Sequence, residues 1–401
     1  RSYKYSFNIT NKGGEIMGEA IITRRGGENV NAEVATQKTK IELLAKQIAS
    51  VQLDFNSTYV WGKYTASGGD LLDYVYSTDS SAYPDGGTQG GYYYKIVRPV
   101  LTGISVTTQP TKTTYAVGGS FDSTGMVVTA TYDTGATKEV TGFTFSPQTF
   151  SSAGTKTVTI SYTENGVTKT TTLSVTVIQI GAFATSTWAE IKAAVQAGIN
   201  GLDLSEHWAV GDTKSVTLTT NEVIELQIAG FNHDTYSDGV TAPVTLVMKN
   251  CLNAKYYMNS SNTNSGGYPA SAMKTWVETN IYNKLPSDLK AIVAPVKKKC
   301  YTTYNSASSL SEANYNVWLL AEAEVFDSVS YTIGSGEGTK YPIFTDNASR
   351  VKKVNNSANL WWLRSCYQDS SYRFVIVYYD GGVNYHTASG SGGVVVGLCV
   401  R

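Results

Sequence analysis

The chain has 401 residues, a formal net charge of zero and only 16% charged residues. This length predicts two or three domains rather than one. The lack of a net positive charge disfavours a nucleic-acid-binding protein, which needs a basic surface to contact phosphates. The sequence has no apolar run long enough to span a membrane, so we expect no membrane insertion. Runs of Thr, Val, Tyr and Gly favour β-structure.

The N-terminal residues suggest that translation of the native protein starts at Met17. Residues 11–17 read NKGGEIM, and Lys-Gly-Gly can be encoded by a bacterial ribosome-binding sequence. We therefore expect residues 1–16 to be a translated leader, and an ordinary flexible N-terminus is the alternative. The sequence that begins at Met17, MGEAIITRRGG, resembles the opening of many prophage-encoded tail-region proteins.

Residues 17–100 are expected to form a small mixed N-terminal domain. Apolar residues at three- and four-residue spacing predict a helix over 33–51. This helix either packs on its own domain or forms a short coiled coil at the axis of a homotrimer. Asp85-Gly86-Gly87 predicts a turn, because glycine accepts positive φ angles. The segment resembles a module of prophage proteins, in which it would serve attachment or spacing.

Residues 101–179 are expected to form an all-β immunoglobulin-like sandwich. Two alternating runs flank Asp133-Thr134-Gly135, and a second pair flanks Glu164-Asn165-Gly166. Val158, Ile160 and Tyr162 alternate with Thr and Ser, as in a half-buried strand. The pattern and the length are those of a bacterial Ig-like domain. Such a domain is expected to act as a spacer, with glycan binding as the alternative.

Residues 180–401 are expected to form an α+β domain. Thr187 and Glu190 form a capping box before a helix that places Trp188, Ile191 and Val195 on one face. A second helix is predicted over Ser271–Leu285, ended by Pro286, and a third from Ser287. The remainder reads as short strands and long loops.

Several segments of this last domain resemble one family. They are HWAVGD (207–212), IAGFNHD (228–234), WWLRS (361–365) and GVVVGLCV (393–400). Together they are similar to the prophage domain family with a C-type-lectin-like, or formylglycine-generating-enzyme-like, fold. Members include the variable proteins of diversity-generating retroelements, in which a reverse transcriptase rewrites the 3′ end of the gene with errors at adenines. The resemblance therefore implies a hypervariable ligand-binding face.

The composition of Cys366–Arg401 agrees with such rewriting. Randomised AAC or AAT codons cannot produce Lys, Glu, Gln, Met or Trp, and of these the segment contains only Gln368. Lys and Glu are common in ordinary domains. A Tyr-, Gly- and Ser-rich end of biased composition is the alternative. Gln368 departs from the randomised pattern and could be fixed in the template. Tyr offers a large contact surface at little cost in rotamer entropy, and Ser, Gly and Asn add adaptable hydrogen bonds.

The family pattern predicts framework residues before this segment, and both scaffold and display positions within it. Trp361, Trp362, Leu363 and Arg364 are expected to be framework. The predicted scaffold positions are Phe374, Val377, Gly381, Ala388 and Gly393. The predicted display positions, which would bind the ligand, are Tyr367, Asp369, Tyr372, Arg373, Ile376, Tyr378, Tyr379, Asp380, Val383, Asn384, Tyr385, His386, Thr387, Ser389 and Ser391.

No catalytic or metal-binding constellation is expected, and no cofactor. The four cysteines, Cys251, Cys300, Cys366 and Cys399, form no CxxC pair and are expected to be buried free thiols, with a Cys366–Cys399 disulfide as the alternative. His233 and His207 are expected to be hydrogen-bonded structural residues, and His386 lies in the variable segment. Asp346-Asn347 is a weak candidate for calcium.

We expect a non-enzymatic binding protein of a phage tail or fibre. The N-terminal module would attach it to tail or baseplate proteins, the Ig-like domain would space it, and the C-terminal domain would bind a protein or glycan of the host cell surface. A bacterial surface adhesin, a structural tail component and an enzyme of the formylglycine-generating type are the rival hypotheses. The corresponding location is the virion or the bacterial cell surface.

Overall fold

The computed structural model describes residues 99–133 and 135–401 in full, together with the backbone of 2–10, 16–25, 59–64, 71–77 and 92–96. The helix expected over 33–51 and the turn at 85–87 lie outside the described residues. The described residues fall into two units. One holds the N-terminal strands with most of the strands β6, β8 and β9, and the other holds β7 and everything from residue 172 onward.

The N-terminal strands form two small antiparallel sheets. Strand β1 (Ser2–Thr10) pairs with β2 (Ile16–Arg25). Strand β3 (Tyr59–Tyr64) lies between β4 (Leu71–Ser77) and β5 (Tyr92–Ile96). The described backbone of this region is therefore β-structure.

The middle of the chain is the predicted all-β region. One sheet has the order β6 (Leu101–Thr108), β8 (Val127–Tyr132) and β9 (Thr137–Val140). The other has the order β10 (Thr144–Ser146), β11 (Gly154–Glu164), β12 (Val167–Ile178) and β7 (Thr114–Ala116). The chain thus passes from one sheet to the other several times.

The hairpin of β11 and β12 confirms the prediction for this segment. Asn165 and Gly166 join the two strands with φ angles of 50° and 76°. Two positive φ angles are what a two-residue type I′ turn requires, and Asn-Gly is its preferred sequence. Val158 and Ile160 are buried, whereas the intervening threonine is half-buried. The alternation therefore gives this strand one buried face.

Helix α2 (Trp188–Ile199) opens the C-terminal region as predicted. The Oγ1 of Thr187 accepts a hydrogen bond from the backbone N–H of Glu190, at 3.2 Å. The carboxylate of Glu190 accepts one in return from the backbone N–H of Thr187, at 2.7 Å. Trp188, Ile191 and Val195 are buried on the inner face. The capping box and the apolar stripe were both readable from the sequence.

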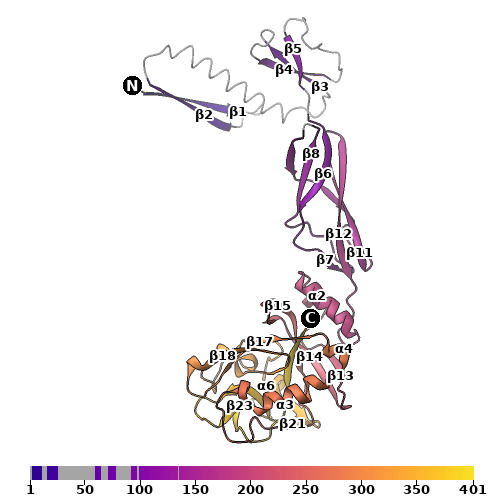
Figure 1. The fold of residues 1–401 in the computed structure, drawn as a ribbon. Helices are drawn as coiled ribbons and strands as arrows, with labels where there is room; N and C mark the ends of the chain where they lie inside the picture. The colour runs from indigo at the N-terminus through magenta and orange to yellow at the C-terminus, as the bar shows by residue number, and fades with distance from the viewer. Residues whose placement is uncertain are drawn as a thin grey trace. The chain divides into compact units, whose positions relative to one another are not determined.

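The principal sheet of the C-terminal region has the strand order β13-β14-β15-β25-β16, and β19 also pairs with β25. These strands are β13 (Thr213–Thr217), β14 (Val223–Thr235), β15 (Thr241–Met248), β16 (Val293–Ala294), β19 (Trp318–Leu319) and β25 (Val396–Val400). The last strand of the chain therefore lies between earlier strands, as its yellow arrow in Figure 1 shows. All five residues of β25 are buried.

The second predicted helix is shorter than expected. Helix α3 (Ala272–Asn280) is capped by Ser271, and a 3₁₀ turn, η3 (Tyr282–Lys284), separates it from Pro286. Ile281 is buried with φ −116°, so burial of this side chain accompanies a break in the helical backbone. Helix α4 (Ser287–Lys290) begins where a third helix was predicted.

The remaining elements are short. Their helical turns are η1 (Leu204–Glu206), η2 (Tyr268–Ala270), η4 (Ala307–Ser309), α5 (Glu322–Val325), η5 (Ser335–Glu337) and α6 (Asn347–Arg350). Their strands form the pairs β17 (Val296–Tyr301) with β18 (Leu310–Tyr315) and β20 (Lys352–Val354) with β21 (Ser357–Asn359). No helix among the described residues is both long and apolar enough to cross a membrane.

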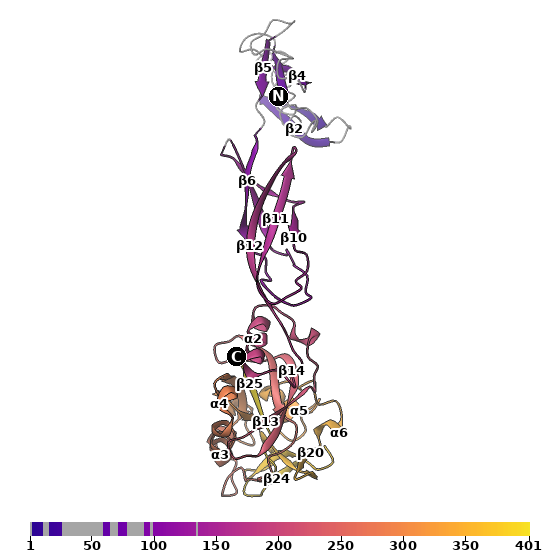
Figure 2. The same ribbon diagram turned by 90° about the vertical axis from the view of Figure 1, so that its right-hand side faces the viewer.

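A three-stranded antiparallel sheet carries the predicted framework and display positions. Its order is β22 (Trp361–Cys366), β23 (Arg373–Val377) and β24 (Val383–Thr387), so β24 is an edge strand. In Figure 2 this edge strand lies at the end of the C-terminal region opposite helix α2. One hydrophobic core, which includes Trp318, Trp361 and Trp362, runs beneath both sheets.

Candidate functional site

The framework of the candidate site is the fully buried strand β22. Arg364 has no exposed surface, and its two terminal nitrogens donate to the carboxylate of Glu324 at 2.5 and 3.0 Å. The backbone oxygens of Leu319 and Lys299 accept two further hydrogen bonds from its guanidinium. A buried cation needs this degree of pairing. Trp361, Trp362, Leu363 and Arg364 are all fully buried, in agreement with their expected framework role.

The predicted scaffold positions are all buried. Phe374, Val377 and Ala388 have no exposed surface, and Gly381 and Gly393 are buried as well. Gly381 has φ +84°, and a Cβ on it would lie 1.9 Å from the backbone oxygen of Asn347. Only glycine fits this position, both for its backbone angle and for the close approach of the neighbouring chain.

The predicted display positions are exposed or half-buried, with one exception. Ile376 is 1% exposed and packs in the core, so its prediction as a displayed residue is wrong. It pairs with Trp362 on β22 and with Asn384 on β24, which places it in the middle strand of the sheet. A middle strand that is covered on both faces leaves no position for display.

Tyrosines from two distant segments gather on one side of this sheet. The rings of Tyr367 and Tyr385 stack with centroids 4.3 Å apart, and Tyr331 lies 5.6 Å from the first and 5.7 Å from the second. The guanidinium of Arg373 lies 4.6 Å from the centroid of Tyr385 and 5.0 Å from that of Tyr372. We call these five residues the tyrosine cluster. Cation–π and aromatic pairs of this kind hold exposed rings in place.

A second aromatic group lies on the other side of β24, because successive residues of a strand point to opposite faces. His386 stacks on Trp362 with centroids 5.4 Å apart, and the Nε1 of Trp362 donates to the backbone oxygen of Tyr256 at 2.8 Å. Tyr256 in turn stacks on Trp276 and on Tyr257. Burial lowers the pKa of His386, which favours its neutral form.

Three other predicted display positions lie in the turn between β23 and β24. Tyr379 is 52% exposed, and its ring lies 3.9 Å from that of Tyr378. Asp380 Oδ1 accepts a hydrogen bond from the backbone N–H of Gly382 at 2.9 Å, which closes the turn. The hydroxyl of Ser389 donates to Oδ1 of Asn262 at 2.6 Å. A loop that precedes the C-terminal segment therefore contacts the displayed residues.

Sequence reasoning missed the aromatic residues that precede the C-terminal segment. Tyr331, Tyr256, Tyr257 and Trp276 all contribute rings to the two groups. One signal was available: residues 256–268 read YYMNSSNTNSGGY, the same Tyr-, Asn-, Ser- and Gly-rich composition as the displayed segment. No comparable signal marks Tyr331.

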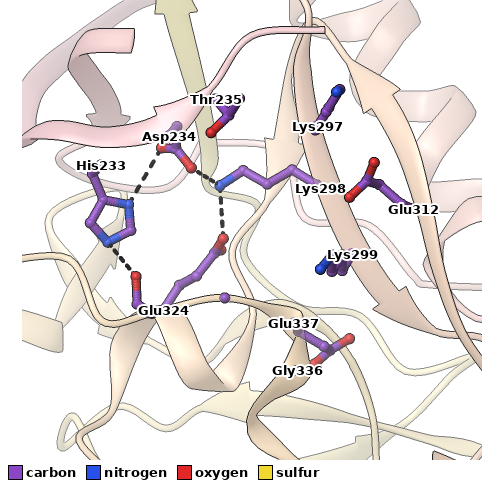
Figure 3. A pocket seen from close by; sticks show the side chains of 12 residues that line it. His233, Asp234, Thr235, Lys297, Lys298, Lys299, Glu312, Glu324, Gly336 and Glu337 are labelled. Atoms are coloured by element: carbon purple, nitrogen blue, oxygen red, sulfur yellow. Dashed lines mark hydrogen bonds and ion pairs between the residues drawn. The ribbon is translucent and has the colours of Figure 1, made fainter. Parts of the chain in front are cut away.

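A separate pocket of about 500 Å³ lies beside strands β14 and β17 (Figure 3). Its inner wall is a row of buried charged groups. The ammonium of Lys298 donates to Asp234, to Glu324 at 2.8 Å and to the hydroxyl of Tyr341 at 2.8 Å. These three hydrogen bonds use every N–H of the ammonium. Lys298 therefore has no free lone pair or donor with which to act on a substrate.

The carboxylates of this row are held by their partners. Burial opposes ionisation of Asp234, but Lys298 and the hydrogen bonds outweigh it, and the pKa of Asp234 lies below its ordinary value. Burial raises the pKa of Glu337 to about 7, although Arg364, Ser365 and the backbone N–H of Tyr301 act against it. Asp234, Lys298, Glu324 and Arg364 are thus paired charges, whereas Glu337 is a buried carboxyl group with a raised pKa.

His233 borders the same pocket as a structural residue, as predicted. Its Nε2 lies 3.1 Å from the hydroxyl of Thr339 and 3.3 Å from the backbone oxygen of Lys340. Its ring packs against Tyr341 with centroids 4.1 Å apart. His207, by contrast, is exposed, so the expectation of a structural histidine is wrong there.

All four cysteines are free and buried, as the favoured interpretation predicted, and Cys366 and Cys399 form no disulfide. Burial raises the pKa of Cys251 and of Cys300 to about 12, and raises those of Cys366 and Cys399 further. A thiol must ionise to act as a nucleophile. The described thiols are therefore packing residues in this structure.

The weak calcium candidate is used for helix capping. Asp346 accepts a hydrogen bond from the backbone N–H of Ser349 at 2.8 Å, and Asn347 Oδ1 accepts one from Arg350 at 2.7 Å. Across the part of the chain that the structure describes, no three His, Cys, Asp or Glu residues are grouped to hold a metal ion.

Comparison with known families assigns two parts of the chain. Residues 108–177 match a bacterial Ig-like domain of group 3, and residues 242–401 match a domain of unknown function, DUF6273. No curated protein matches the chain. The chain thus carries a bacterial Ig-like domain, followed by a mixed α/β region that contains a DUF6273 domain.

Proposed function

We propose that the chain is a non-enzymatic binding protein whose C-terminal region, 180–401, displays a ligand-binding face on a C-type-lectin-like fold. One observation carries the proposal: the exposed and half-buried display positions of β24 and its flanking loops rest on a framework that is wholly buried. Side chains on such a face can change without disturbing the core. Tyr is the most frequent residue among the display positions, and Tyr and Arg are among the residues that most often contribute binding energy in interfaces.

The proposal includes diversification of this face by a retroelement. The display positions lie in the segment whose composition fits randomised AAC or AAT codons. The scaffold positions within that segment are buried and would have to be spared. A mechanism that rewrites a binding face must leave the protein folded. It therefore requires this division into changeable surface positions and fixed buried positions.

The remaining regions would place the face at a distance from its anchor. Residues 17–100 would attach to phage tail or baseplate proteins, and residues 101–179 would act as a spacer. The ligand would be a protein or glycan on the surface of the host cell. The enzyme rival gains no support from the site, because the described thiols have raised pKa values and Lys298 is fully paired.

Deep amplicon sequencing of the 3′ end of the gene, in a population that carries the element, tests the proposal. We expect substitutions at the display codons that trace to adenines in a nearby template repeat. The codons of Phe374, Gly381 and Ala388 should stay constant. A uniform 3′ end would remove diversification from the proposal and leave a fixed adhesin or structural protein.

Adsorption of the labelled full chain to host cells separates binding from a structural role. Replacing Tyr378, Tyr379 and Tyr385 by Ala should abolish adsorption with little effect on thermal unfolding, since Tyr379 is exposed and the other two are only half-buried. Tyr282→Ala is a matched control, because Tyr282 is half-buried beside Lys290 and outside the display positions. Unchanged adsorption by the triple variant would favour a structural tail component.

A further inference from the structure

The tyrosine cluster contains one residue that does not belong to the C-terminal segment. Tyr331 follows α5 in the chain, yet its ring packs against those of Tyr367 and Tyr385. Tyr331 is half-buried, and its ring lies beside two display positions. Rewriting of Cys366–Arg401 would leave Tyr331 unchanged.

The backbone of Tyr331 is held by a buried carboxylate. Glu322 has no exposed surface and accepts hydrogen bonds from three successive backbone N–H groups, those of Ser330, Tyr331 and Thr332, at distances from 2.6 to 3.2 Å. Charge-assisted hydrogen bonds in a buried setting are stronger than neutral ones at the surface. The loop that carries Tyr331 is thus fixed from within.

A second residue fixes the same loop from the other side. The backbone N–H of Gln368 donates to the backbone oxygen of Tyr331 at 2.7 Å, and its side-chain amide donates to the backbone oxygen of Ser330 at 3.2 Å. Gln368 is also the residue of the C-terminal segment that randomised AAC or AAT codons cannot produce. Its structural role gives a reason for that exception, because a changed side chain would loosen the loop.

We propose that Tyr331 is a constant contact residue of the binding face that supports affinity, and that Glu322 and Gln368 are its positioning residues. The inference rests on the proposed function. Every variant of the face would present the same tyrosine next to variable neighbours. A preorganised ring loses little rotamer entropy on binding, so one fixed aromatic contact supports affinity for many ligands.

The test uses yeast display of the full chain with the codons of Tyr367, Asp369, Tyr372, Arg373 and Tyr385 randomised, and egg-white lysozyme as the probe. We expect Tyr331→Ala, introduced into the selected clones, to weaken lysozyme binding by about tenfold or more in most of them. Tyr331→Phe should retain most of the affinity, because it keeps the ring. Tyr282→Ala should have no effect.

The outcomes separate the two proposals. Unchanged affinity of Tyr331→Ala in most clones would overturn the role of Tyr331 and leave the binding face in place. Failure to select any binder, from a library whose members fold, would overturn the binding face itself and the inference with it.

The positioning residues are tested in the same clones by double substitution. Glu322→Gln should weaken lysozyme binding as Tyr331→Ala does. The double variant should bind no more weakly than Tyr331→Ala alone, because both substitutions act through the same ring. If Glu322→Gln does not fold, Gln368→Ala provides the test, since it removes the side-chain hydrogen bond to Ser330 and leaves the backbone hydrogen bond to Tyr331 intact. Effects that add independently would show that neither residue acts through Tyr331.

Amplicon sequencing adds an independent readout. In populations where the codons of Tyr367 and Asp369 vary, the codon of Gln368 should remain constant. Free variation at Gln368 alongside its neighbours would contradict its assignment as a positioning residue.

Discussion

The carboxyl group of Glu337 lies at the end of the buried row that begins at Asp234 and Lys298. It accepts hydrogen bonds from the hydroxyl of Ser365 and from the backbone N–H of Tyr301, at 3.1 Å for the latter. Desolvation is the largest influence on it and raises its pKa to about 7 from an ordinary value of 4.5. A buried group whose pKa differs between the folded and unfolded states makes stability depend on pH.

The first prediction concerns this dependence. Because the folded state binds the proton of Glu337 more tightly than the unfolded chain does, its contribution to stability is complete below about pH 4.5. The contribution is lost as the pH rises through about 7. The loss amounts to roughly 3 kcal/mol or less, at about 1.4 kcal/mol for each unit of pKa difference. Chemical denaturation between pH 4.5 and 8 measures it.

Glu337→Gln provides the control, because an amide does not titrate in this range. The difference between wild type and variant isolates Glu337 from His386, whose lowered pKa makes stability rise with pH in the same interval. Identical pH profiles of the two proteins would show that Glu337 does not titrate near pH 7.

Gly381 marks the limit of sequence reasoning at the scale of one residue. The sequence suggested that this glycine is a scaffold position, and its burial agrees. The reason lies in the backbone oxygen of Asn347, which belongs to a different element and leaves no room for a Cβ. Local patterns predict that a glycine is needed at a turn, but not which distant segment comes close to it.

At the scale of elements, local signals were reliable where one face is buried. The hairpin at Asn165-Gly166 and the capping box of α2 follow from turn and cap chemistry and from a single apolar stripe. Strand β23 has no such signal, because FVIV is apolar at every position and all four of these residues are buried. The misassignment of Ile376 follows from that lack of alternation.

The second prediction exchanges residues between β23 and β24. Ile376→Asn should destabilise the protein by about 3 kcal/mol or more, since it places an amide in a fully buried site. Asn384→Ile, at the paired position on the edge strand, should change stability by about 1 kcal/mol or less because Asn384 is half-buried. Urea denaturation compares the two, and equal effects would contradict the assignment of Ile376 to the core.

Under the proposed function, stability and binding would reside in different parts of the C-terminal region. The buried row of Asp234, Lys298, Glu324 and Arg364 joins β14, β17, α5 and β22, so it connects elements that are far apart in the chain. The display positions contribute few contacts of this kind. No sequence pattern revealed the row, because its members are brought together only by the complete fold.

The third prediction tests this separation in the whole molecule. Glu324→Gln removes a charge that pairs with both Lys298 and Arg364, and should lower stability by about 3–5 kcal/mol. In a domain of this size that is a fall in Tm of roughly 6 °C or more. Changing Tyr367, Tyr372, Tyr379 and Ser391 together to Ala should move Tm by about 3 °C or less, because these side chains are exposed or half-buried. Differential scanning calorimetry of the full chain measures both. A fourfold variant that unfolds as early as Glu324→Gln would mean that the display positions also support the fold, and a face so constrained could not be rewritten freely.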